Sequence, residues 1–117
     1  MLAAVEYFRE LHIPRSLTAI VVFLYVCENE GLIVTELATA TGLSVSIAAR
    51  TAKILSGDYA EFPVRPHERL LELSSSQGDA RLRHIYLTDA GRRVRDRLDE
   101  YIARAVPIRS EPLRQIA

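Results

Sequence analysis

The sequence predicts a mainly α-helical domain of the α+β class, with one small β-hairpin. Apolar residues recur at helical spacing near both ends of the chain. Two short helical segments in the middle flank a tight turn at Gly42, and a later segment alternates apolar and charged residues. The 117 residues suffice for one modest core. We therefore expect a single domain over residues 1–117.

The first two helices are expected at residues 1–12 and at about 17–29. The first carries apolar residues at positions 1, 4, 5, 8 and 11, and Pro14 ends it. The second is apolar on two sides, which predicts burial from two directions. Its two stripes are Leu17, Ile20, Val21, Leu24 and Cys27, and Ala19, Val22, Phe23 and Val26.

Cys27 is the single cysteine, which excludes an intramolecular disulfide and a multi-cysteine zinc site. Its apolar neighbours Phe23, Leu24 and Val26 favour a small core residue. A redox-sensing thiol is the alternative interpretation of this position.

A helix-turn-helix is expected next, from a short helix at about 34–40 and a longer one at 45–56. Gly42 suits the end of the shorter helix, and Ser44 suits the N-cap of the longer one. Residues expected to face inward from the longer helix are Ile47, Ala48, Thr51, Ile54 and Leu55.

The remaining elements are a loop, a hairpin and a last helix. Residues 57–69 contain two prolines and lack a clear period, so they are expected to form the loop. Strands at 70–74 and 81–87, joined by residues 75–80, would form the hairpin. Thr88 would cap a helix from 89 to about 105, before a loose tail after Pro107. The apolar stripe of that helix is Val94, Leu98, Tyr101, Ile102 and Ala105, and its expected i,i+4 ion pairs are Arg92/Asp96, Arg95/Asp99 and Glu100/Arg104.

Two motifs connect these elements to a known family. The first comprises Glu36-Leu37-Ala38, Gly42-Leu43-Ser44 and Leu55; the second comprises Asp79, Arg81, Leu87, Thr88 and Gly91. At these positions the chain resembles MarR-type winged-helix transcription regulators, over about residues 17–105. One departure is the segment Gly57-Asp58-Tyr59 with its proline-containing loop, an insertion of roughly ten residues where the family begins its first wing strand.

The resemblance implies a winged helix-turn-helix flanked by N- and C-terminal helices. Residues 1–33 would hold the N-terminal helices, 34–88 the helix-turn-helix and wing, 89–106 the C-terminal helix, and 107–117 the tail. The recognition helix, about 45–56, would lie in the major groove of DNA, and the wing, 75–83, on the backbone or in the minor groove. The resemblance thus implies a sequence-specific regulator that binds double-stranded DNA as a homodimer through its N- and C-terminal helices.

The candidate DNA contacts lie on the recognition helix, at helix starts and on the wing. Arg50 is the residue of the helix face that can pair bidentately with guanine, whereas the hydroxyls of Thr35 and Ser44 suit phosphate at helix N-termini. The candidates are Thr35, Ser44, Ser46, Ala49, Arg50, Lys53, Asp79, Arg81 and Arg83. Simpler interpretations are capping for Thr35 and Ser44, a solvated face for Arg50 and Lys53, and a local Asp79/Arg81 salt bridge.

Catalysis, cofactors and metals find no support in the sequence. His12, His67 and His84 lack ligand spacing, and no nucleophile motif or phosphate loop is present. Residues 1–11 are charged where a signal peptide is apolar, and no apolar run reaches the ~20 residues of a membrane span. We expect a cytoplasmic protein that is not an enzyme, uses no cofactor and does not enter a membrane.

The formal net charge of zero leaves a second function class open. The alternative is a winged-helix module for protein interaction or dimerisation without DNA binding, favoured by Asp58 and Glu61 and by the Tyr59/Phe62 pair. An interruption of the positive surface by Asp58, Glu61 or Glu72 would support that alternative. The family resemblance also raises a small-molecule effector pocket between the dimer helices and the winged helix.

Overall fold

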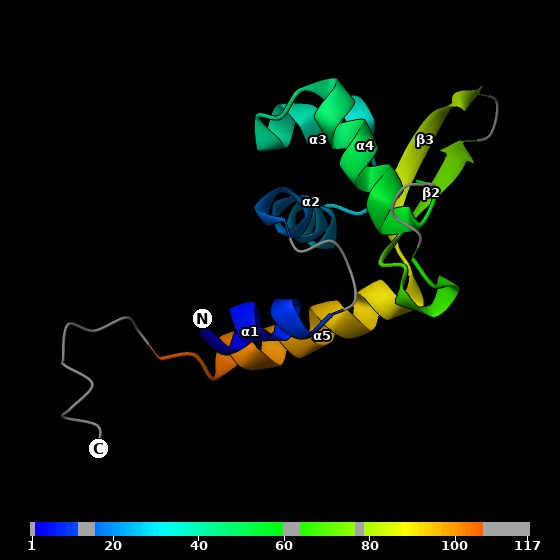
Figure 1. The fold of residues 1–117 in the computed structure, drawn as a ribbon. Helices are drawn as coiled ribbons and strands as arrows, with labels where there is room; N and C mark the ends of the chain where they lie inside the picture. Colours follow the sequence, from blue (N-terminus) through cyan, green and yellow to red (C-terminus); the bar gives the residue numbers. More distant parts are fainter. Residues whose placement is uncertain (1, 12–15, 60–63, 77–78, 107–117) are drawn as a thin grey trace, which may run out of the picture.

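The structure is a computed structural model that describes residues 2–11, 16–59, 64–76 and 79–106, without the side chains of 76 and 79–81. The terminal helices lie side by side as one layer, one helix lies above them, and the helix-turn-helix and hairpin lie beyond it (Figure 1). This arrangement confirms the predicted α+β class. The helices are α1 (Leu2–Glu10), α2 (Leu17–Glu28), α3 (Val34–Thr41), α4 (Val45–Ser56) and α5 (Asp89–Ala103), with a 3₁₀ turn at Pro66–Glu68.

The sheet has three antiparallel strands in the order β1-β3-β2. They are β1 (Leu32–Ile33), β2 (Leu71–Ser76) and β3 (Asp79–Leu87). The short β1 was not predicted, because two residues cannot show an alternating pattern. Strand bounds of 70–74 and 81–87 were wrong, since backbone pairing continues to Ser76 and Asp79 despite their turn-forming side chains.

Side-chain caps set the starts of three helices. Ser16, Ser44 and Thr88 accept hydrogen bonds from the backbone N–H groups of Ala19, Ile47 and Gly91 at 3.0–3.2 Å. Gly42 and Gly57 end α3 and α4 in the left-handed conformation, with φ of 76° and 81°. The predicted tight turn at Gly42 and the caps Ser44 and Thr88 are confirmed.

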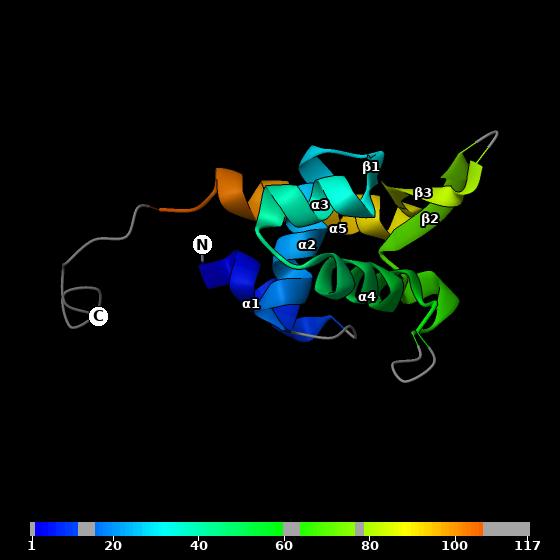
Figure 2. The same ribbon diagram turned by 90° about the horizontal axis from the view of Figure 1, so that it is seen from above.

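One core joins the layers, and α2 lies at its centre, beneath α3 and α4 (Figure 2). The stripe Ala19, Val22, Phe23 and Val26 is buried. The other stripe is only partly covered, with Leu17 and Leu24 exposed, so the expected burial of α2 from two directions does not occur within one chain. Cys27 packs at the edge of the core.

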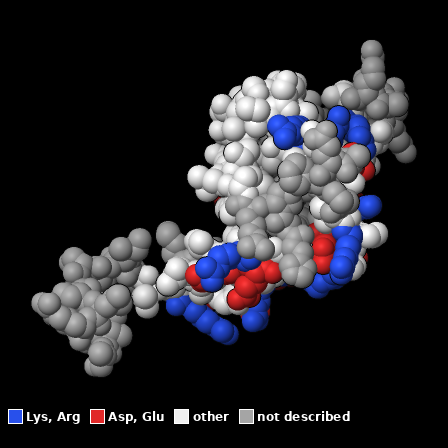
Figure 3. Space-filling model, in the orientation of Figure 1, with Lys and Arg blue, Asp and Glu red and all other residues white. Residues whose placement is uncertain are grey.

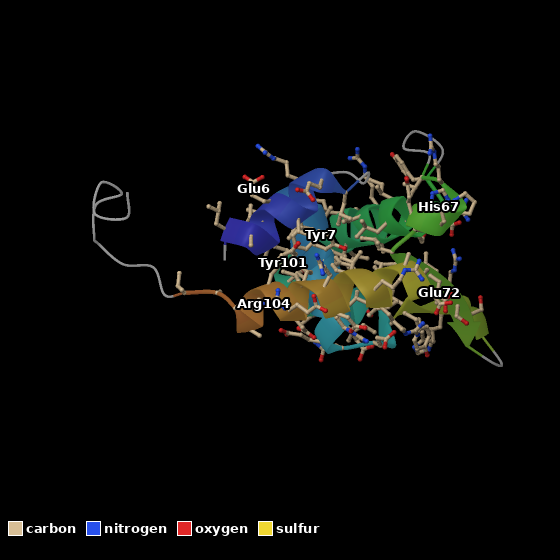
Figure 4. The ribbon with its side chains drawn as sticks, turned by 90° about the horizontal axis from the view of Figure 1, so that it is seen from below. Glu6, Tyr7, His67, Glu72, Tyr101 and Arg104 are labelled. Atoms are coloured by element: carbon tan, nitrogen blue, oxygen red, sulfur yellow. The ribbon has the colours of Figure 1, made fainter. Side chains whose placement is uncertain are left out.

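Helices α1 and α5 run in opposite directions, with Tyr7 and Tyr101 pointing toward one another at 5.6 Å between ring centroids (Figure 4). Val94 and Leu98 are buried as predicted. Ile102, in the last turn of α5, is 60% exposed, and Ala105 lies beyond the end of the helix and is exposed too.

The prediction of ion pairs between residues four apart along α5 was wrong, because the arginines of α5 pair with other carboxylates. Among the described residues, Arg92 pairs with Asp89, Arg95 with Asp96 and Arg97 with Glu100, at 3.0–3.3 Å. These contacts are exposed, so we assign them little stability.

Ile47 was also placed wrongly, since it is 48% exposed. It lies about a quarter turn from the centre of the buried face of α4, which holds Ala48, Ala52 and Leu55. The first turn of α4 therefore presents two apolar side chains to solvent, Val45 and Ile47.

Candidate nucleic-acid interface

The outer face of α4 presents polar and basic side chains. Ser46, Arg50 and Lys53 are exposed, opposite the buried Ala48, Ala52 and Leu55. Ala49 is half-buried at the border of this face. The helix therefore presents the predicted side chains to one side of the molecule, held there by burial of the opposite face.

The two candidate hydroxyls at helix starts occupy different positions. Ser44 is exposed and caps α4. Thr35 is not a cap, so the capping interpretation was wrong for it: the N-cap of α3 is Ile33, whose N–H donates to Glu36 Oε1 at 3.0 Å. Thr35 is exposed one residue inside α3.

A cavity of about 200 Å³ lies between α4 and the hairpin. Its lining is largely apolar, and the cations Lys53 and Arg83 also line it. The other lining residues are Ile33, Val34, Thr35, Ala49, Leu73 and Leu82. Four of the predicted DNA-binding residues, from α3, α4 and β3, are thus brought together around one hollow.

Arg83 is held by two acceptors. Its Nη2 lies 3.3 Å from Asp58 Oδ2 and 3.5 Å from the carbonyl oxygen of Leu73. The side chain is 41% exposed, so the pair with Asp58 is reached by solvent. Asp58 thus interrupts the positive surface next to β3, one of the outcomes expected for a protein-interaction module; Glu61 lies outside the described residues.

Arg50 contacts an aromatic ring from the segment after α4. Its Cζ lies 5.6 Å from the ring centroid of Tyr59, within cation–π range. Asp58 and Tyr59 were predicted to favour the protein-interaction alternative and not to belong to the DNA-binding site, because the loop has no period that ties it to α4. The available signal was Gly57, whose helix-ending conformation turns the chain back along α4.

Asp79 and Arg81 belong to β3 by backbone, and their side chains lie outside the described residues. The pairing register shifts between Ser75, opposite Arg83, and Ser76, opposite Asp79. Because of this β-bulge, β3 has residues 80–82 between two positions that are opposite consecutive residues of β2, close to the tip of the hairpin.

Basic side chains form separate patches over α4 and over the hairpin, with some acidic surface near the hairpin, whereas both signs mix around α1 and α5 (Figure 3). In the described part of the chain, no three His, Cys, Asp or Glu residues are grouped to hold a metal. Burial raises the pKa of the Cys27 thiol to about 12, which disfavours the reactive thiolate. No helix among the described segments is long and apolar enough to cross a membrane.

Comparison with known proteins places this geometry in a fold. No family model matches the chain, and no curated protein matches it by sequence. Among solved structures, the chain is similar to a MarR transcriptional regulator from Methanosarcina mazei Go1, with a TM-score of 0.54 at 13% sequence identity. The match covers 92% of this chain and 71% of the regulator's chain. The chain has the fold of MarR regulators. In this fold, α3 and α4 are the helix-turn-helix, and β2 and β3 are the wing.

Two further structures share the MarR fold. Streptococcus pneumoniae FabT, solved in complex with DNA, matches 76% of the chain with a TM-score of 0.55 at 15% identity; the chain spans 57% of FabT. RV1404 from Mycobacterium tuberculosis matches 98% of the chain with a TM-score of 0.63 at 16% identity, and 78% of its own chain is covered. The MarR fold is thus retained while most residues differ.

Proposed function

We propose that the protein is a sequence-specific transcription regulator that binds double-stranded DNA as a homodimer. The observation that carries the proposal is the outer face of α4, where Ser46, Arg50 and Lys53 are exposed on the helix that follows the turn. The fold supports it, because FabT has this fold and was solved in complex with DNA. A regulator of this kind needs no catalytic group.

In the proposed complex, α4 lies in the major groove with its N-terminal half toward the base edges. Arg50 is the bidentate partner for guanine O6 and N7. The exposed Val45 and Ile47 would contact thymine methyl groups. Ser44 and Thr35 would bind phosphate at the starts of α4 and α3, and Arg81 and Arg83 would reach the backbone or minor groove from the wing.

The proposed homodimer forms through the terminal helices. Leu2 and Val5 of α1 are 74% and 56% exposed, and Ile102 of α5 is 60% exposed. A symmetric partner would bury these side chains and place two copies of α4 about one DNA turn, ~34–36 Å, apart. The operator would then be a pseudo-palindrome.

A zero net charge makes DNA affinity depend on local cations. Replacing Lys53 or Arg81 with alanine is expected to weaken binding to all sequences and to reduce the salt slope by about 0.9 per lost phosphate contact. The test is fluorescence anisotropy with the full chain on random and genomic duplexes from about 50 mM salt upward. An unchanged affinity and slope in both variants would remove these residues from the interface.

The Asp58–Arg83 pair favours the second candidate, a protein-interaction module, since it neutralises one candidate DNA cation. The two candidates differ in a direct measurement: the module would not bind duplex DNA at about 50 mM salt. For the effector, the candidate volume is a cavity of about 190 Å³ between α1, α5 and the 3₁₀ segment, lined by Tyr7, Leu11 and Val94 among others.

A further inference from the structure

The corner formed by Gly57, Asp58 and Tyr59 is fixed to the end of α4. The N–H of Gly57 donates to Ile54 O at 3.2 Å, and the N–H of Asp58 donates to Lys53 O at 2.9 Å. Gly57 is left-handed, and a Cβ on it would lie 2.3 Å from Arg69 Nε. The corner is therefore set by helix-end hydrogen bonds and by packing on its outer side.

Both side chains of this corner contact predicted DNA-binding cations. Tyr59 lies against the guanidinium of Arg50, with 5.6 Å between Cζ and the ring centroid. Asp58 lies 3.3 Å from Arg83 Nη2. This short segment lies outside both the helix-turn-helix and the wing, yet it contacts Arg50 of the helix-turn-helix and Arg83 of the wing.

The contact with Tyr59 limits the directions that Arg50 can take. An exposed arginine samples many rotamers, and ordering it on binding costs free energy. A ring beside a guanidinium leaves its N–H donors free in the plane while it restricts the side chain. Because Tyr59 is half-buried and follows a fixed backbone, it can serve as the rigid partner.

We propose that Tyr59 is a specificity-determining positioning residue that holds Arg50 in the orientation that reads guanine. The inference rests on the proposed DNA-binding function and adds to it a residue that lies after the recognition helix. Removing the ring lowers discrimination for guanine more than it lowers general DNA affinity, because phosphate contacts come from other residues.

The test is selection from a random duplex library with the full-length wild type, Arg50→Ala, Tyr59→Leu and Tyr59→Phe. We expect one guanine position of the wild-type site to disappear in Arg50→Ala, to weaken in Tyr59→Leu and to persist in Tyr59→Phe. On the selected duplex, Tyr59→Leu should bind about three- to five-fold more weakly, with unchanged affinity for a scrambled duplex. Asp58→Asn changes the same corner without removing the ring: it frees Arg83 from its ion pair, so it should raise affinity for all duplexes alike and leave the guanine preference intact.

Three results would overturn the proposal. The first is an equal loss of affinity on the selected and scrambled duplexes. The second is an equal effect of Tyr59→Leu with and without Arg50→Ala. The third is tighter binding by Tyr59→Leu, which would mean that Tyr59 holds Arg50 away from DNA. Side-chain NMR of Arg50 without DNA adds an independent readout: the ring-current shift should disappear in Tyr59→Leu. If the wild type shows this ring-current shift but does not bind DNA, the proposed function is refuted while the contact between Tyr59 and Arg50 stands.

Discussion

Gly91 shows how a single residue joins two parts of the fold. It lies in the first turn of α5, and a Cβ there would stand 2.2 Å from the carbonyl oxygen of Leu70. Alanine normally stabilises a helix by ~1 kcal/mol relative to glycine. Here the clash is with backbone, so we predict that Gly91→Ala lowers the free energy of unfolding by about 2 kcal/mol or more.

Urea unfolding measures this difference. Gly42→Ala is the control, because a Cβ at Gly42 would meet open space. This variant should lose only the ~1 kcal/mol of stability that the left-handed backbone costs an alanine. A neutral or stabilising Gly91→Ala would contradict the described packing of α5 on the segment before β2.

Cys27 gives a prediction about pH. Burial raises its pKa from 9.0 to about 12, so the unfolded chain releases the thiol proton at lower pH than the folded chain does. This contribution to stability is present below pH 9.0 and is lost as pH rises toward about 12. Between about pH 8 and pH 11, urea unfolding should show a larger stability loss for the wild type than for Cys27→Ala. Equal losses would show that the thiol is not desolvated.

Residues that act locally were predictable from sequence, and residues that act through tertiary contacts were not. Ser44 and Thr88 have the right side chains directly before an apolar helical pattern, and both cap. Thr35 also precedes such a pattern, but Ile33 and Glu36 define that helix start. Tyr59 reaches Arg50 only because Gly57 turns the chain, which no periodicity records.

At the scale of elements, the helices and the hairpin were predicted within a few residues, whereas β1 and its place in the sheet were not. Helices carry a 3.6-residue period over many residues, as α4 does. The pairing of β1 with β3 joins residues about 50 apart, and the bulge near Ser76 depends on backbone pairing. A strand of two residues such as β1 is too short to show an alternating pattern, so the sequence does not indicate its partner.

Thr88 connects β3, α5 and the segment before β2. Its hydroxyl accepts from the Gly91 N–H at 3.0 Å and donates to Arg69 O. We predict that Thr88→Ala lowers the free energy of unfolding by about 1–2 kcal/mol, because both bonds are lost. Thr88→Ser retains the hydroxyl and should lose less than about 0.5 kcal/mol. Equal losses in urea unfolding would assign the effect to the methyl group.

At the scale of the whole molecule, the apolar surface of the terminal helices predicts self-association. Ile102→Glu places a charge in the proposed dimer interface and should shift the protein toward monomer in sedimentation equilibrium, with unchanged circular dichroism. Ile47→Glu is the matched control, since Ile47 is similarly exposed but lies on α4. If Ile102→Glu has the same association state as the wild type, the dimer does not form through this end of α5.

DNA binding by the protein is tested most directly by the salt dependence of the affinity of the wild-type chain for duplex DNA. We expect binding at about 50 mM salt, a linear fall of log affinity with log salt concentration, and a selected site that is bound more tightly than its scramble at every salt concentration. No binding to random, genomic or selected duplexes at about 50 mM salt would contradict this expectation.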